Sequence, residues 1–145
     1  MLAPSSSTGM TPMQGRAFID TNIVIYSLGA NSTKAQIVAP LFLGAPTIST
    51  QVLSETANVA FKRLSLSLAE TRVLITTLEA MCHVEVISMV TIHTAFDIRE
   101  RYGFSWYDSL IIASALEADC DVLYSEDMQN EQEINGRLRI VNPFA

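Results

Sequence analysis

Short apolar segments of strand type alternate with helical segments along this chain. The strand-like segments are AFID (17–20), PTIS (46–49), HVEVIS (83–88), DVLYS (121–125) and LRIVN (138–142). The helical segments between them are predicted at 23–28, 35–43, 50–63, 68–81, 91–101 and 104–119. Strands that are separated by helices form βαβ units, in which the strands run parallel. The alternation therefore predicts an α/β fold of three layers, α/β/α, with a central and mostly parallel sheet.

The length of 145 residues fits one domain, which we predict over residues 16–145. Residues 1–15 are rich in Ser, Thr, Pro and Gly and are predicted to form a flexible tail. They have neither the basic start nor the apolar block of a secretory signal, and the chain has no apolar run of the ~18 residues that a membrane span needs. Two cysteines give no disulfide framework, so a cytoplasmic location is expected.

The chain is acidic, with a formal net charge of −6 at pH 7. This charge argues against a broad basic groove that binds nucleic acid tightly without a cofactor. It leaves open a nucleic-acid enzyme whose cations are metal ions. A zinc site is not indicated, because the cysteines and histidines lack the usual ligand spacing: Cys82, His83, His93 and Cys120.

Four acidic residues follow the predicted strands at matching places. Asp20 ends the first strand and Asp127 follows the fourth, while Glu55 lies in the first turns after the second strand and Asp108 opens a later helix. In a parallel sheet, the carboxyl ends of the strands and the helix starts that follow share one edge, where open α/β folds bind ligands. The sequence therefore predicts that the four acids meet in one cleft.

Carboxylates that lie close together repel one another and raise one another's pKa unless a cation binds between them. An all-oxygen set of ligands suits Mg²⁺ or Mn²⁺. Such ions polarise a phosphodiester, lower the pKa of a water molecule and stabilise the leaving oxygen. The cations that we consider for positioning a nucleic-acid strand are Lys34, Lys62, Arg63, Arg99 and Arg101.

Each acid taken alone also has a simpler interpretation. Asp20 can cap the next helix, and Glu55 can be a solvated helix residue. The run from Ser105 to Asp108 fits the [ST]-x-x-[DE] capping box, in which the acid bonds to the backbone of the cap residue. Trp106 and Tyr107 can stack on a base or simply pack. The four acids together favour a metal site over these separate explanations.

Four stretches of the sequence resemble the PIN domain, and in particular the VapC-type toxin ribonucleases. They are FIDTN (18–22), Glu55, YGFSWYDSLIIASAL (102–116) and YSED (124–127). The resemblance covers about residues 17–143. It implies a Mg²⁺-dependent endoribonuclease, the toxin of a type II toxin–antitoxin system, which is restrained by a cognate antitoxin protein and usually works as a homodimer.

By position in these motifs, the resemblance assigns the metal-site acids to Asp20, Glu55, Asp108 and Asp127. Two polar residues match those that support the acids, Asn22 and Ser125. Ser125 stands where Thr is frequent, and it keeps the hydroxyl group. Glu126 competes with Asp127 for the inward position and stays an alternative.

The sequence thus predicts hydrolysis of single-stranded or looped RNA with Mg²⁺ or Mn²⁺ as cofactor. A signalling receiver domain would need a lysine after a late strand, and the chain has only Lys34 and Lys62. A phosphatase of the haloacid dehalogenase type would need Asp-x-Asp, whereas Asp20 is followed by Thr21 and Asn22. A PIN-like module that binds RNA or protein without cleavage remains the alternative.

Overall fold

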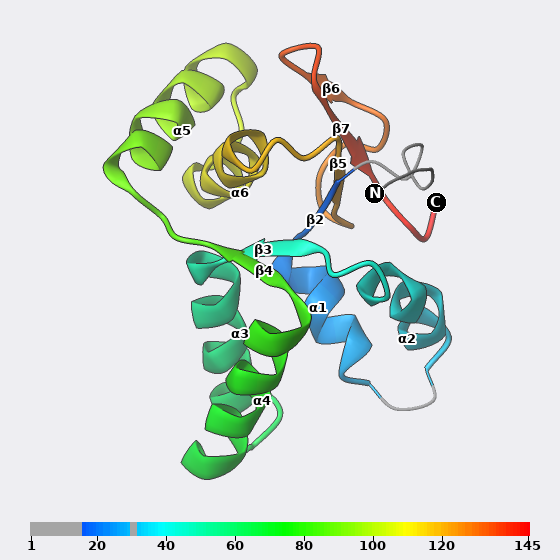
Figure 1. Cartoon of the computed structure of the whole chain (residues 1–145). Coiled ribbons are helices and arrows are strands. Elements are labelled where there is room, and N and C mark those ends of the chain that lie inside the picture. Colours follow the sequence, from blue (N-terminus) through cyan, green and yellow to red (C-terminus); the bar gives the residue numbers. More distant parts are fainter. Residues whose placement is uncertain (1–15, 30–31) are drawn as a thin grey trace, which may run out of the picture.

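The computed structural model describes residues 16–29 and 32–145, and within them the chain forms a six-stranded sheet in the order β4-β3-β2-β5-β7-β6 (Figure 1). The strands are β2 (Ala17–Ile19), β3 (Thr47–Ser49), β4 (His83–Glu85), β5 (Val122–Tyr124), β6 (Glu133–Ile134) and β7 (Leu138–Val141). All neighbouring pairs are parallel except β6 with β7. The predicted mostly parallel sheet is confirmed. The predicted tail, 1–15, lies outside the described residues.

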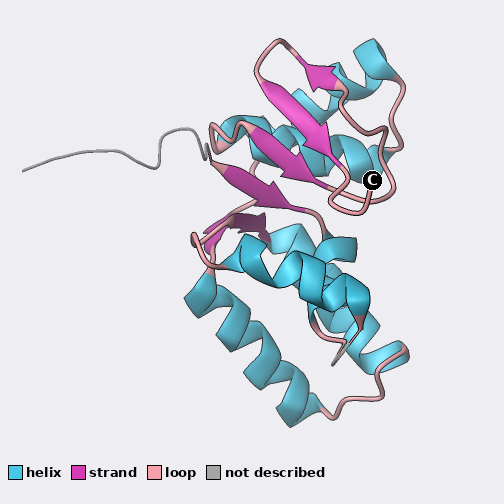
Figure 2. Ribbon diagram, turned by 90° about the vertical axis from the view of Figure 1, so that its right-hand side faces the viewer, coloured by secondary structure: helices cyan, strands magenta, loops and turns pink. Residues whose placement is uncertain are grey.

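Helices pack on both sides of this sheet (Figure 2). They are α1 (Thr21–Ser27), α2 (Thr33–Val38), the 3₁₀ helix η2 (Ala39–Phe42), α3 (Thr50–Lys62), α4 (Leu68–Met81), α5 (Met89–Tyr102) and α6 (Trp106–Glu117). Helices α1 to α4 connect β2, β3 and β4, and the chain then returns through α5 and α6 to β5, beside β2. The direction of winding reverses between β2 and β5, which is where such folds bind ligands.

The core lies between the central strands and α6. Phe18 and Ile19 of β2 are fully buried, as are Ile48 of β3 and Leu123 of β5. Helix α6 is buried along the whole of 109–116. A helix that is apolar on all sides must be enclosed by protein, and α6 is enclosed between the sheet and α5. The starts of α1 and α6 are thereby fixed relative to the end of β2.

Two predicted elements were wrong in extent. The helix predicted at 35–43 ends at Val38 and continues only as η2, since Pro40 lacks the N–H that an α-helix needs and clashes with the preceding turn. The strand predicted at 83–88 ends at Glu85, and Val86 is exposed. The sequence also missed β6, because a strand of two residues has no alternation to detect.

Most helix ends follow sequence signals. Ser67 and Glu70 form a complete capping box at the start of α4. Helix α5 ends at Tyr102, and its C-cap is Gly103, which has φ +79° in the left-handed region. None of the helices within 16–29 and 32–145 has the length and apolarity that a membrane span needs.

Replacement of Gly103 by alanine should lower the free energy of unfolding by about 1 kcal/mol, because a Cβ is unfavourable at φ +79° even though the space around it is open. The control is Gly44→Ala, whose Cβ also meets open space but whose φ lies outside the left-handed region. Denaturant unfolding measures both variants. Equal stability of the two variants would contradict this role of Gly103.

Candidate functional site

Asp20 lies where the central strand passes directly into a helix. It follows β2 and is the N-cap of α1, and it is only 6% exposed. Its carboxylate accepts hydrogen bonds from the backbone N–H of Thr21 at 2.6 Å and from the hydroxyl of Ser125 at 2.8 Å. The backbone N–H of Asp20 donates to the carbonyl of Tyr124, which continues the pairing of β2 with β5. Asp20 is thus held by both central strands.

The side chain of Asn22 joins Asp20 to the segment after β5. Its amide nitrogen lies 3.0 Å from Oδ2 of Asp127 and 3.5 Å from Oδ2 of Asp20. Its amide oxygen accepts from the backbone N–H of Glu126 at 3.3 Å. Both ends of the amide are used, so Asn22 brings Asp20 and Asp127 to one place.

Glu126, the alternative to Asp127, has other partners. Its carboxylate pairs with Lys34 of α2 and accepts from the hydroxyl of Tyr26. These hydrogen bonds, from Lys34 first and Tyr26 second, lower the pKa of Glu126. The Lys34 amine also lies 4.5 Å from the ring of Tyr26 and 4.7 Å from that of Phe144. The structure therefore places the carboxylate of Asp127, and not that of Glu126, beside the amide nitrogen of Asn22 that also reaches Asp20.

Glu55 reaches the site from α3. It accepts a hydrogen bond from the hydroxyl of Thr21, next to Asp20. The amide nitrogen of Gln51 donates to Glu55 at 3.4 Å and to the carbonyl of Tyr107 at 3.2 Å. Gln51 thus connects α3 to the first turn of α6. Sequence reasoning missed this residue, because a glutamine in an amphipathic helix carries no signal of its own.

Asp108 forms only half of the predicted capping box. Its backbone N–H donates to the hydroxyl of Ser105 at 3.2 Å, which caps α6. Among the described hydrogen bonds, none returns from the Asp108 carboxylate to the Ser105 backbone. Burial raises the pKa of this carboxyl, and repulsion from Asp127 and Glu55 raises it further against the opposing effect of Ser105. Asp127 and Glu55 are therefore near enough to Asp108 for their charges to act on its carboxyl group.

Burial and charge together perturb Asp20 most strongly. Burial raises the pKa of Asp20 from 3.8 to about 6, although hydrogen bonds from Ser125 and Thr21 lower it. Repulsion from Asp108 and Glu55 acts in the same direction as burial. Each of the four predicted acids therefore lies near enough to another to influence a pKa, and the structure brings all four to the same end of the sheet.

The donor set fits a hard divalent cation. Within the described part of the chain, no three Asp, Glu, His or Cys side chains stand close enough together to chelate a metal ion by themselves. Mg²⁺ does not require this, because it is commonly held by one or two carboxylates and completes its shell with water and phosphate. Asp20 and Asp127, joined through Asn22, provide such a pair of oxygen ligands.

The predicted positioning cations have different surroundings. Lys34 is paired with Glu126, Arg99 donates to the carbonyl of Phe104, and Arg101 donates to the side chain of Asn135. Lys62 and Arg63 are exposed at the end of α3. Of the five, only Arg63 lines the cavity of about 700 Å³ that adjoins Thr21, Asn22 and Glu55.

The two aromatic residues at the start of α6 also differ. Trp106 packs on Phe96 of α5, with ring centroids 4.8 Å apart, whereas Tyr107 is exposed.

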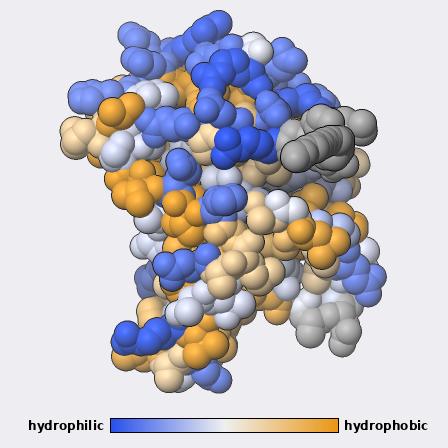
Figure 3. All heavy atoms as spheres, in the orientation of Figure 1, coloured by the Kyte–Doolittle hydropathy of each residue, from blue (hydrophilic) through white to orange (hydrophobic). Residues whose placement is uncertain are grey.

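In Figure 3, hydrophilic residues gather over the part of the molecule where β6 and β7 lie, and apolar residues are more frequent around and below β3.

Residues 17–132 match the family described as PIN domain. Among solved structures, a toxin–antitoxin complex from Klebsiella pneumoniae has a TM-score of 0.68 at 21% identity, over 88% of this chain and 97% of that one. VapC20 from Mycobacterium tuberculosis, a sarcin-ricin loop cleaving toxin, has a TM-score of 0.60 at 17% identity, over 74% and 86%. FitAcB from Neisseria gonorrhoeae has a TM-score of 0.63 at 16% identity, over 88% and 98%. None of the curated proteins matches the sequence.

The raised pKa of Asp20 predicts a pH dependence of stability. Because its folded pKa of about 6 exceeds the unfolded value of 3.8, its stabilising contribution is full below pH 3.8 and is lost as the pH rises through 6. The loss amounts to about 3 kcal/mol. In metal-free protein, the difference in unfolding free energy between Asp20→Asn and wild type should therefore grow in favour of the variant from about pH 4 to about pH 7.

Denaturant unfolding in EDTA at several pH values measures this difference. Asp97→Asn is the control for the loss of one negative charge, since Asp97 is exposed on α5. A difference between Asp20→Asn and wild type that does not change with pH would contradict the assignment of the shift to Asp20.

Proposed function

The chain belongs to the PIN-domain family, and on that basis we propose that it is a metal-dependent endoribonuclease, the toxin of a type II toxin–antitoxin pair. The observation that carries the proposal is the meeting of Asp20 and Asp127 through Asn22 at the switch point of the sheet. Glu55 and Asp108 lie on the helices that border the same place. The substrate in this proposal is single-stranded or looped RNA.

In this proposal Asp20, Glu55, Asp108 and Asp127 form the site of Mg²⁺ or Mn²⁺: Asp20 and Asp127 are the paired ligands, and Glu55 and Asp108 complete the acidic surroundings of the ion. Asn22 and Ser125 keep Asp20 and Asp127 in place. When bound, the ion supplies Lewis-acid polarisation of the phosphodiester and relieves the repulsion among the acids. Asp20 is held by Ser125 and Thr21, so it is suited to a fixed ligand position. Asp108 is half-buried at the start of α6, beside the other acids, so its carboxylate is suited to accept a proton from the attacking water.

The antitoxin is the proposed partner. The structural neighbours include a toxin–antitoxin complex, and an acidic cleft is complementary to a cationic side chain. An arginine of the partner can form bidentate hydrogen bonds with carboxylates and occupy the place of the metal ion. The proposal also includes a homodimer, for which exposed apolar residues on α4, such as Leu68 and Val73, offer contact surface.

Purified protein should cleave RNA in the presence of Mg²⁺ or Mn²⁺, and EDTA should stop this cleavage.

Asp108→Asn should reduce RNA cleavage to background. The metal-free variant should be no less stable than metal-free wild type, because one repelling charge is removed. Mg²⁺ at a hundredfold excess over its dissociation constant should stabilise wild type by about 2.7 kcal/mol, and the variant by less. Asp97→Asn should cleave normally. Cleavage that persists in EDTA would refute the metal-dependent mechanism. Normal cleavage by Asp108→Asn, together with a full metal-induced shift in stability, would return Asp108 to a capping role.

Expression of the protein alone should arrest growth, and a co-expressed antitoxin should relieve the arrest by blocking the acidic cleft. The double variant Asp20→Asn, Asp127→Asn should not arrest growth, since both acids joined by Asn22 lose their charge. RNA cleavage by the purified complex provides the biochemical measurement. A complex that forms stably and keeps full ribonuclease activity would refute blockage of the cleft.

A further inference from the structure

A groove leads away from the acid cluster along α1 and α3. The cavity of about 700 Å³ is bordered at one end by Thr21, Asn22 and Glu55, which contact the acid cluster directly. At its other end it is bordered by Arg63, the C-cap of α3. The groove is therefore continuous with the proposed catalytic site, and its two ends carry opposite charges.

Helix α3 fixes the distance between these ends. Residues 55, 58, 59 and 63 are spaced by three or four positions and so face the groove from one side of the helix. At 1.5 Å per residue, Arg63 lies about 12 Å along the axis from Glu55. This length corresponds to roughly three stacked nucleotides of a single strand.

The wall of the groove combines apolar and polar contacts. Ile25 and Tyr26 of α1 line the groove together with Val59 of α3, and Asn58 adds an amide that can both donate and accept hydrogen bonds. Exposed bases of single-stranded RNA are bound by apolar and aromatic surfaces, together with hydrogen bonds to the base edge. The composition of the wall fits a base on an unpaired strand.

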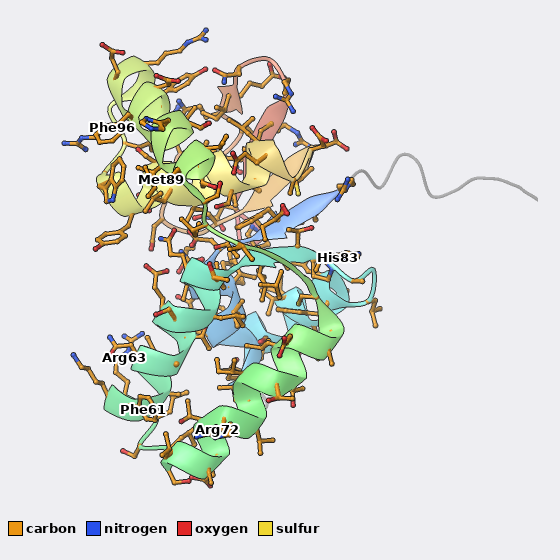
Figure 4. The ribbon with its side chains drawn as sticks, turned by 60° about the vertical axis from the view of Figure 1, so that its left-hand side comes forward. Phe61, Arg63, Arg72, His83, Met89 and Phe96 are labelled. Atoms are coloured by element: carbon orange, nitrogen blue, oxygen red, sulfur yellow. The ribbon has the colours of Figure 1, made fainter. Side chains whose placement is uncertain are left out.

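Arg63 is available to an outside ligand. The ion pairs among the described residues are Lys34–Glu126, Arg137–Asp119 and Arg139–Glu131, and none uses Arg63. Figure 4 shows Arg63 near the C-terminal end of α3, beside Phe61. A guanidinium with no acidic partner in an acidic protein is a suitable contact for a phosphate group.

We propose that this groove binds the single-stranded RNA that flanks the scissile phosphate, with Arg63 on a backbone phosphate and Asn58 on a base edge. The inference rests on the proposed function for the position of the scissile phosphate. The charge order favours RNA: acids that hold a metal ion at one end and a guanidinium at the other match successive phosphates of one strand.

The first test is binding of fluorescent single-stranded RNA in Ca²⁺, which replaces Mg²⁺ so that binding is measured without cleavage. Arg63→Met should weaken binding about tenfold and lower the salt slope of binding by about one. Asn58→Ala should keep the salt slope and change the preference for a base at one position. Lys62→Met removes the same charge from an exposed neighbour that does not line the groove, and should change the slope less.

The second test is cleavage of RNA oligonucleotides that extend the scissile dinucleotide by increasing lengths on either side. Arg63→Met should raise KM for the long substrates on one side, and leave kcat and the shortest substrate unchanged. Equal KM and equal binding for Arg63→Met and Lys62→Met would overturn the inference. So would a loss of antitoxin binding in Arg63→Met with RNA binding intact, since the groove would then hold a peptide.

The two proposals fail in different ways. RNA that binds in an Arg63-dependent manner, but is not cleaved in the presence of Mg²⁺ or Mn²⁺, would refute the ribonuclease proposal and leave the groove assignment standing. RNA that is cleaved with no dependence on Arg63 or Asn58 would refute the groove assignment alone. A protein that binds no RNA in Ca²⁺ would refute the groove assignment directly.

Discussion

The carboxylate of Asp20 sits at the end of the central strand, where burial opposes its ionisation. Three structural elements meet at this residue. Asp20 follows β2, its carboxylate caps α1, and the carboxylate accepts a hydrogen bond from the hydroxyl of Ser125, which follows β5. These hydrogen bonds lower its pKa, yet burial and the nearby acids still raise it to about 6. The arrangement holds an acid where the fold alone does not favour its charge. Carboxyl groups whose pKa is shifted by burial and by nearby charges cluster at functional sites.

The topology explains how acids so distant in the sequence come together. The chain winds outward from β2 to β4 and returns to β5, so the segments after β2 and β5 begin side by side. Asn22 uses both atoms of its amide to fix that junction, with Asp127 on one side and the backbone of Glu126 on the other. The same winding puts the start of α3 and the start of α6 at its border, which brings Glu55 and Asp108 within electrostatic reach.

The sequence predicted what depends on local pattern. Alternating segments indicated the parallel sheet, and the acids after strand ends indicated where they would meet. The break at Pro40 followed a local rule that the helical periodicity obscured. The partners of Glu126, namely Lys34 and Tyr26, could not be predicted, because they lie about a hundred residues away and meet it only in the folded chain. The bridge from Gln51 to Tyr107 is of the same kind, since it depends on how α3 and α6 are placed.

Among the described residues, the basic side chains near the acid cluster do not neutralise Asp20 and Asp127, so a cation from outside the chain is needed to relieve the repulsion between the acids. Lys34 forms an ion pair with Glu126, which directly precedes Asp127 in the sequence, so it neutralises Glu126 and not Asp127. The repulsion among the remaining acids is then relieved by whatever cation enters. Under the proposed function, a divalent ion and a guanidinium of the partner protein compete for that place, so each weakens the binding of the other by the same factor. Under the proposed function, activation by metal and inhibition by antitoxin are two outcomes of one electrostatic constraint.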